Sequence, residues 1–233
     1  MYYRFIFACI LLCFVGCSTL AVKPDRILSY NNGIAIIQDK QAKSKIQIEI
    51  AQEVVGGFER IPLIFYIVVE NLHDNTLHFS PDNISFEIDN KHIKPYDFNA
   101  IAYSNLSVAQ ALYDYGIVPK LPNSAINDPF FSISAYHPYY SMPIPFMIDG
   151  GFFMAYRFYD YSFARANYAA QLESYNARKF LIAHYLRKNT LNKNDVRGGF
   201  VLIPYSRLKV GDMYINVKVG EEKYRFLVKL LKN

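Results

Sequence analysis

The sequence predicts a mainly β protein, an antiparallel sandwich interrupted by a long insertion, on three observations. Short segments near both ends of the chain alternate apolar and polar residues with a period of two, the pattern of strands with one solvated face. Gly, Asn and Asp separate these segments, as expected at turns. Between the two sets lie about a hundred residues, 98–197, that lack the alternation. We therefore expect one β-sandwich in two halves, 33–97 and 198–233, around an insertion.

The first half contains the clearest strand patterns. Ile46, Ile48 and Ile50 alternate with polar residues, which predicts a strand with one wet face. Residues 63–69 are apolar at every position, so we expect a central strand that is covered on both faces. Segments 76–80 and 83–88 follow as a strand, a corner and a strand, and Asp89 begins a hairpin turn.

The second half predicts three more strands. Residues 199–204 are apolar, and residues 214–219 alternate before a turn at 220–222. A last strand follows, with alternate side chains on one face: Tyr224, Phe226, Val228 and Leu230. About eight short strands joined by turn residues favour an antiparallel sandwich.

The insertion combines helix with irregular chain. We expect a short helix over residues 104–115 that ends at Gly116, and then a proline-rich loop region, since proline excludes regular structure. A helix of about twenty-five residues is predicted from a cap at Ser162 to Leu186, with an apolar stripe that packs on the sandwich. Gly56-Gly57, Gly150-Gly151 and Gly198-Gly199 are expected to be turns or bulges.

The first sixteen residues have the composition of a secretory signal peptide. Arg4 is followed by an uncharged run from Phe5 to Val15, too short at 1.5 Å per residue to cross a hydrocarbon core of about 30 Å. Because residues 5–22 together carry no charge, an uncleaved anchor is the alternative, and an ordinary secreted protein is a third. Cys9 and Cys13 lie inside the segment that would be removed, so the mature chain would hold no disulfide.

Phe14, Val15, Gly16 and Cys17 resemble the lipobox of bacterial lipoproteins, with Phe14 where that family prefers Leu. The resemblance implies cleavage before Cys17, attachment of diacylglycerol and palmitate-like acyl chains to that cysteine, and anchoring on a membrane of the cell envelope. Ser18 implies the outer membrane, with the body in the periplasm or at the cell surface. Residues 17–32 are then expected to form the lipidated cysteine and a tether, which spans about 50 Å when fully extended at roughly 3.3 Å per residue.

A second resemblance concerns the folded body. Glu70-Asn71-Leu72, residues 79–85 and residues 94–97, together with Gly198-Gly199-Phe200-Val201 and the terminal hairpin, look like the immunoglobulin-like domain of many uncharacterised bacterial lipoproteins. This resemblance covers about half of the chain and implies an immunoglobulin-like sandwich in which Asn71 caps the central strand. It implies no catalytic residue.

No catalytic or metal-binding motif is present in the sequence, and we expect no enzyme activity, no cofactor and no metal. His73, His78, His92 and His137 are expected in solvated turn or loop positions, and His184 lies too far along a helix from Glu173 to share a metal ion with it. After loss of Arg4, twenty-four basic side chains would remain against twenty acidic ones, a mild excess that says little about partners. A nucleic-acid partner is not expected because the chain is expected to be exported.

The best candidate for a binding surface is an aromatic run between Phe130 and Tyr161, which holds twelve aromatic residues in thirty-two. Five tyrosines of this run are the candidate binding residues: Tyr136, Tyr139, Tyr140, Tyr156 and Tyr159. Tyrosine suits protein partners, sugar stacking and membrane interfaces alike, although these rings can equally fill a core. We therefore expect a non-enzymatic envelope lipoprotein with a protein partner, alternatively a glycan- or lipid-binding module, and third an enzyme with an unrecognised site.

Overall fold

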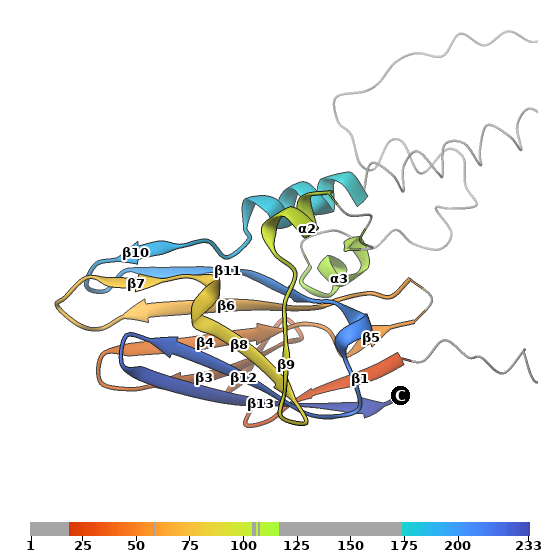
Figure 1. The fold of residues 1–233 in the computed structure, drawn as a ribbon, viewed down its shortest axis with the longest axis horizontal. Helices are drawn as coiled ribbons and strands as arrows, with labels where there is room; N and C mark the ends of the chain where they lie inside the picture. The colour runs from red at the N-terminus through yellow and green to blue at the C-terminus, as the bar shows by residue number, and fades with distance from the viewer. Residues whose placement is uncertain (1–18, 58, 104–105, 107, 117–173) are drawn as a thin grey trace, which may run out of the picture.

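The computed structural model describes residues 19–57, 59–103, 106, 108–116 and 174–233, and within them the chain is mainly β (Figure 1). One antiparallel sheet has the strand order β5-β1-β13-β12-β8-β9. Its strands are β1 (Thr19–Pro24), β5 (Val54–Gly56), β8 (Ile84–Ile88), β9 (Lys91–Ile93), β12 (Gly211–Val219) and β13 (Glu222–Lys232). The expected antiparallel arrangement of strands is therefore confirmed.

A second antiparallel sheet, in the order β11-β6-β4-β3-β2, faces the first. Its strands are β2 (Ser29–Asn31), β3 (Ile34–Lys40), β4 (Ser44–Ile50), β6 (Leu63–Asn71) and β11 (Val196–Ile203). Two short strands, β7 (Leu77–Phe79) and β10 (Asn189–Leu191), pair with each other beside it. The remaining described elements with printed bounds are helical: α2 (Phe98–Tyr103), α3 (Ala109–Asp114), η1 (Pro81–Asn83) and η2 (Tyr205–Arg207).

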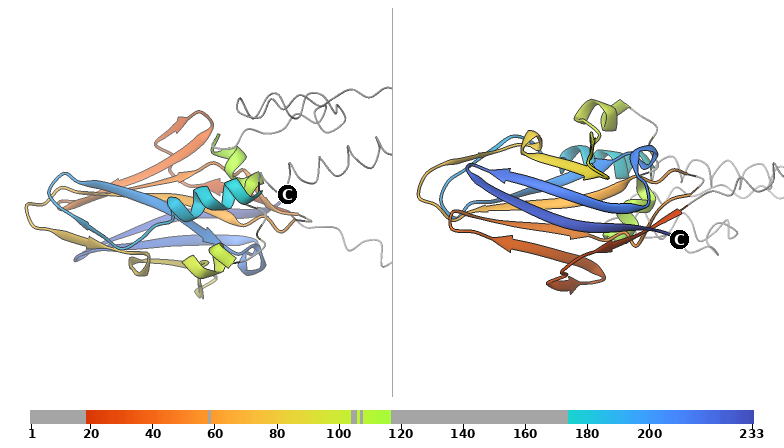
Figure 2. Two further views of the ribbon diagram at one scale, coloured as in Figure 1. Left: turned by 90° about the horizontal axis from the view of Figure 1, so that it is seen from above. Right: turned by 60° about the horizontal axis from the view of Figure 1, so that its bottom comes forward.

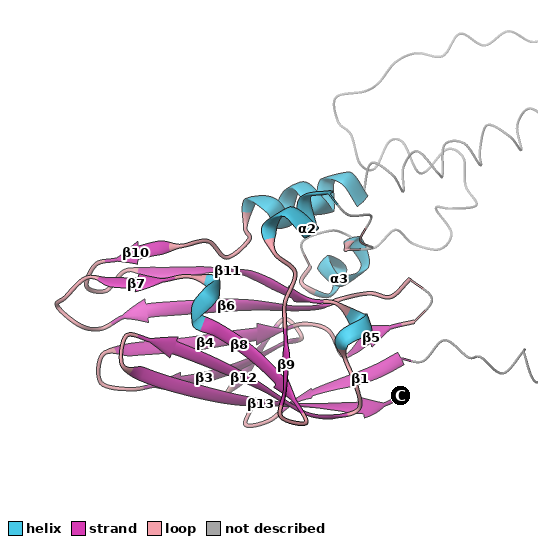
Figure 3. Ribbon diagram, in the orientation of Figure 1, coloured by secondary structure: helices cyan, strands magenta, loops and turns pink. Residues whose placement is uncertain are grey.

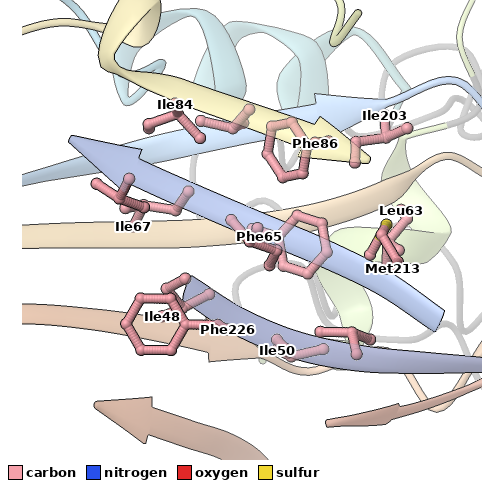
Figure 4. Packing of buried hydrophobic residues seen from close by; sticks show 14 of the residues in the cluster. Ile48, Ile50, Leu63, Phe65, Ile67, Ile84, Phe86, Ile203, Met213 and Phe226 are labelled. Atoms are coloured by element: carbon pink, nitrogen blue, oxygen red, sulfur yellow. The ribbon is translucent and has the colours of Figure 1, made fainter. Parts of the chain in front are cut away.

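The main core lies between the two sheets, where inward side chains of both interdigitate (Figure 4). The rings of Phe65 on β6 and Phe86 on β8 stack across it with centroids 5.7 Å apart. The strand predicted to be covered on both faces is confirmed, because Phe65 and Ile67 enter this core while Ile64 points to the other side. The alternation along β4 is confirmed as well, since Ile46, Ile48 and Ile50 are all buried.

A second, smaller core covers the outer face of β6 and β11, where the helices gather (Figure 3). Leu112 of α3 and Leu181 of the helix at residues 174–183 are fully buried against Phe200 and Leu202. The expectation that the helix before the last strands packs on the sandwich is thus confirmed for its described part. As predicted, the helical segment that contains α3 ends at Gly116, which adopts φ +67°.

The predicted tether over residues 17–32 is wrong from Thr19 onward. Leu20 and Val22 alternate with Ala21 and Lys23, and both are buried in the main core. Their backbone pairs with β13 on one side and with β5 on the other. The residues that resembled a linker lie at strand ends and in a turn: Pro24 ends β1, Asn31 ends β2, and Asn32 at φ +50° lies in the β2–β3 hairpin.

The boundaries of the insertion also need correction. Residues 189–191 and 196–203 are strands, so the sandwich resumes before residue 198. The helix predicted to run to Leu186 ends at residue 183, because the backbone of His184 and Leu186 bonds to Phe200 of β11 instead of continuing the helix. The predicted start of that helix at Ser162 lies outside the described residues. An earlier helix, α2, lies before the one expected at 104–115.

Gly198 and Gly199 are neither a turn nor a bulge but lie inside β11. A Cβ atom on Gly199 would stand 2.5 Å from the backbone of Leu186, so glycine is required by the close approach of that segment. Gly56 and Gly57 do have positive φ, at +93° and +78°, as expected for a turn. Gly150 and Gly151 lie outside the described residues.

Candidate functional site

All of the residues that the sequence singled out as functional lie outside the described part of the chain. Cys17 and the preceding Phe14, Val15 and Gly16 fall in residues 1–18. The five candidate tyrosines fall in residues 117–173. The site is therefore built from the described residues that adjoin these two segments.

Both segments join the sandwich at one end, which we call the proximal end and define by Thr19, Asn233, the β5 hairpin and α3. The backbone of Asn233 donates a hydrogen bond to the Thr19 carbonyl at 3.3 Å, so the first and last described residues of the chain lie together. Gly116 follows α3 directly, and the helix at residues 174–183 begins on the same side (Figure 2). The described residues that adjoin segments 1–18 and 117–173 therefore lie at the same end of the fold.

The described surface is also hollowed at the proximal end. Two adjoining cavities, of about 600 Å³ and 520 Å³, share Gly33, Ala51, Glu53 and Val54 in their walls. We call them together the edge cleft, because they lie where the chain crosses between the open edges of the two sheets. β1 runs along one side of both cavities.

The segment that forms the wall shared by the cavities is held rigidly by buried polar contacts. Gln52 is 2% exposed, donates to the Pro62 carbonyl at 2.9 Å and accepts from the Ile64 amide at 2.7 Å. The side-chain amide of Gln52 thus pairs with one buried carbonyl group and one buried amide group of the backbone. Its role is to support the wall rather than to hold a ligand.

Tyr115, at the end of α3, anchors that helix to the second sheet. Its hydroxyl lies 2.9 Å from the carbonyl oxygens of both Glu49 and Ile64, which share its single proton. Burial raises the pKa of this phenol far above its ordinary value, so the group stays protonated. Tyr115 is therefore a fixed structural donor and not an acid or base.

Both cavities are lined by polar and by apolar residues. The first is bordered by Glu53, Glu59, Asp114 and Gln110 beside apolar residues. The second shares Glu53 and is bordered by Val22 and Ile27 together with Lys23 and Gln52. Such a pair of cavities suits a molecule with an apolar part and a part rich in hydroxyl groups, because carboxylates accept hydrogen bonds from hydroxyls.

A polar cluster at the opposite, distal end consists of Ser44, Glu222 and Tyr224. The Ser44 hydroxyl lies 2.5 Å from a Glu222 carboxylate oxygen and 2.7 Å from the Tyr224 hydroxyl. Burial acts to raise the pKa of Glu222, but hydrogen bonds from Ser44, from the Lys43 amide and from Tyr224 outweigh it and hold the pKa below its ordinary value. Burial raises the pKa of Tyr224 to about 12.

This cluster joins the two sheets and does not resemble a hydrolytic site. Ser44 belongs to β4 and is fully buried, so a substrate cannot reach its hydroxyl. A carboxylate with a lowered pKa is also a poor general base at neutral pH. The hydrogen bonds of this cluster therefore link β4 of one sheet to β13 of the other.

Of the described histidines, His73, His78 and His92 lie in the turn and strand positions that the sequence predicted. His78, His92 and His184 are exposed, and His73 is half-buried in the turn after β6. Within residues 19–116 and 174–233 as described, no three side chains of His, Cys, Asp or Glu come together to hold a metal ion. His137 and Glu173 lie outside that part.

Sequence reasoning missed the edge cleft entirely. Its walls come from residues 19–35, 50–61 and 110–114 and from Asn233, which only the folded chain brings together. One signal was available, because Leu20-Ala21-Val22-Lys23 already alternates with a period of two.

Two further findings concern membrane spans and similarity to known proteins. None of the helices in the described chain is both long and apolar enough to span a bilayer. Comparison of the chain with protein-family models, with curated proteins and with solved structures found no match.

Proposed function

We propose that this chain is a bacterial envelope lipoprotein, cleaved before Cys17 and held on a membrane, most favourably the outer membrane, by lipid on that cysteine. It acts without catalysis and presents a β-sandwich, with its aromatic insertion, to a protein partner in the envelope. The observation that carries the proposal is the uncharged run from Phe5 to Val15 followed by Gly16-Cys17.

The position of β1 limits how late the chain can be cut. Thr19 is the first residue of a strand and lies two residues after Cys17. Cleavage before Cys17 would leave every described element intact, including the buried Leu20 and Val22. A cut a few residues later would remove β1 and expose the pairing edges of β13 and β5.

The finer fold type belongs to the same proposal. We infer an immunoglobulin-like sandwich, supported by the resemblance around Glu70-Asn71-Leu72 and by the role of Asn71. This side chain is fully buried, donates to the carbonyl groups of Asn75 and Leu191, and accepts from the His73 amide. It thus caps the end of β6 and ties it to β10. The long helix from Ser162 also stays a proposal.

The anchor is tested by the intact mass of protein extracted from membranes of a bacterial host. We expect a chain that begins at Cys17 and carries diacylglycerol, with or without a third acyl chain. Cys17→Ala should yield an uncut chain without lipid, whereas the matched control Cys13→Ala should be processed like the wild type. An unlipidated wild-type chain that is uncut, or cut elsewhere, refutes the anchor.

The partner is tested by site-specific photocrosslinking in intact cells. A photoreactive residue at Tyr136, Tyr140 or Tyr156 is expected to trap one reproducible envelope protein. The matched control is Tyr103 of α2, which is 86% exposed and lies outside the aromatic run. Equal trapping at Tyr103, or none at the three tyrosines, contradicts a partner-binding role of the insertion.

The edge cleft favours a second candidate function, a glycan- or lipid-binding module. Gln110 and Asp114 of α3 border the cleft, and residues 117–173, the part of the insertion with the aromatic run, begin just after that helix. Calorimetric titration with envelope glycans and with fatty acids tests this function, with Glu53→Gln as the cleft variant. Binding that is unchanged in Glu53→Gln would exclude the cleft as the site.

A further inference from the structure

The outer face of the six-stranded sheet carries an exposed apolar row at the proximal end. Ala21 of β1 pairs directly with Leu231 of β13 on one side and with Val54 of β5 on the other. Val54 is 41% exposed and Leu231 is 37% exposed, while their neighbours Val55 and Leu230 fill the core. We call Val54, Ala21 and Leu231 the apolar row.

A row of lysines lies one step farther along the same face. Lys23 of β1 and Lys229 of β13 are direct cross-strand partners, and both are exposed. Like charges in that position destabilise a sheet. Among the described residues neither lysine takes part in an ion pair within 4.0 Å, although Asp212 of β12 is the other cross-strand partner of Lys229. We call Lys23 and Lys229 the lysine row.

Both rows lie close to Cys17 along the chain. At no more than about 3.3 Å per residue, Ala21 lies at most about 13 Å from Cys17, and Lys23 lies about 7 Å beyond Ala21 along the strand. The apolar row is therefore nearer to the attached lipid than the lysine row. Lysine stems can lie along apolar surface while the ammonium groups reach phosphate level.

The same face has an internal comparison at its distal end. Lys218 of β12 and Lys223 of β13 are also direct cross-strand partners and exposed, but they lie at the turn between these strands, far along the sheet from Thr19. This second lysine pair has the same chemistry without the proximity to Cys17. It separates a general effect of positive charge from an effect of position.

We propose that the apolar row and the lysine row rest on an anionic phospholipid surface, with the lysines at its phosphates. This inference depends on the proposed lipid at Cys17, because the lipid would keep a small contact at high local concentration. The sandwich then has a fixed orientation on the membrane, with the outer face of β5, β1 and the end of β13 against it (Figures 1 and 2).

The test uses introduced tryptophans, because the natural chain contains none. The lipidated protein with Leu231→Trp is reconstituted in phosphatidylcholine vesicles with phosphatidylglycerol and brominated acyl chains. We expect loss of about half of the emission, because an interfacial side chain lies within roughly 10 Å of the acyl boundary. Asn216→Trp, on the same outer face toward the distal end, is expected to keep its emission.

Charge reversal tests the lysine row in the Leu231→Trp protein. Lys23→Glu with Lys229→Glu should abolish the quenching, whereas the matched pair Lys218→Glu with Lys223→Glu should leave it unchanged. Vesicles of phosphatidylcholine alone should also reduce it. Equal loss with both charge-reversed pairs overturns the assignment of the contact to the proximal lysines.

The remaining outcomes are separable from failure of the anchor. If the mass of the Leu231→Trp protein shows lipid on Cys17 but its tryptophan emission is not quenched, the membrane contact is overturned and the lipoprotein proposal stands. Emission that is already blue-shifted in the lipid-free chain from Ser18 to Asn233, without detergent, shows that another part of the protein covers the apolar row, and also overturns the contact. A protein without lipid refutes the anchor, and with it the orientation on the membrane.

Discussion

Leu20→Ala distinguishes a strand from a tether at the start of the mature chain. Leu20 is 6% exposed and belongs to the main core, so the substitution removes about three buried carbon groups at about 0.8 kcal/mol each. With the cost of the cavity that remains, we expect a loss of about 3 kcal/mol in the free energy of unfolding. For a domain of this size that loss corresponds to a decrease of roughly 6–12 °C in Tm.

The measurement is urea unfolding of the chain from Ser18 to Asn233, followed by circular dichroism. With a slope of about 2 kcal/mol per molar urea, the midpoint should fall by about 1.5 M. Lys23→Ala is the control on the same strand, because its side chain is exposed, and it should stay within about 0.5 kcal/mol of the wild type. An unchanged midpoint for Leu20→Ala would show that these residues are a tether after all.

Further substitutions test three other parts of the fold. Gly199→Ala should lower the free energy of unfolding by more than about 3 kcal/mol, because the new methyl group would meet the Leu186 backbone. In Gly198→Ala the nearest atom is a side-chain methyl of Val68, so the loss should be smaller. Thermal unfolding compares the two variants. Tyr115→Phe should lower the free energy of unfolding by about 1–2 kcal/mol in urea, since two buried carbonyl groups lose a donor. The pKa of Glu222 is lowered in the folded state, so this carboxylate stabilises the fold above the pKa of the unfolded carboxyl, and that stabilisation is lost as the pH falls. The difference in free energy of unfolding between the wild type and Glu222→Gln should therefore shrink on acidification from pH 7.

The sequence predicted those strands whose signal is local. Residues 44–50 and 222–232 alternate because one face of each strand is buried and the other is wet. The turn at Asp89-Asn90 was predictable because both residues adopt positive φ, which Asp and Asn tolerate. Each of these features depends on neighbours within a few residues, and sequence patterns carry that information.

The features that were missed depend on contacts between distant parts of the chain. β1 is stabilised by β13, about two hundred residues away, while Pro24, Asn31 and Asn32 gave the segment the composition of a linker. Leu186 continues the helical period from Ile182, yet its backbone bonds to Phe200. No local pattern distinguishes these outcomes, because the competing partner lies on another strand.

The candidate site shows the same division. The lipobox resemblance and the aromatic run are local patterns, and both fall outside the described residues, so they stay predictions. The edge cleft is made of three separate segments and Asn233, and it has no motif of its own. Its position became evident only from the pairing of β1 with β5, which brings Thr19 beside Gly56.

The correction at β1 changes the proposed role of the lipid. A tether of fifteen residues would let the body stand about 50 Å from the bilayer and meet partners at variable distance. With β1 beginning at Thr19, only two residues would join the proposed lipid on Cys17 to the sheet, a reach of at most about 7 Å. The described flanks of residues 117–173 lie at that same proximal end (Figure 2). If Cys17 carries the proposed lipid, a partner that binds the insertion close to its flanks would lie at the membrane surface, and a component of a membrane-bound assembly fits that geometry better than a freely diffusing protein.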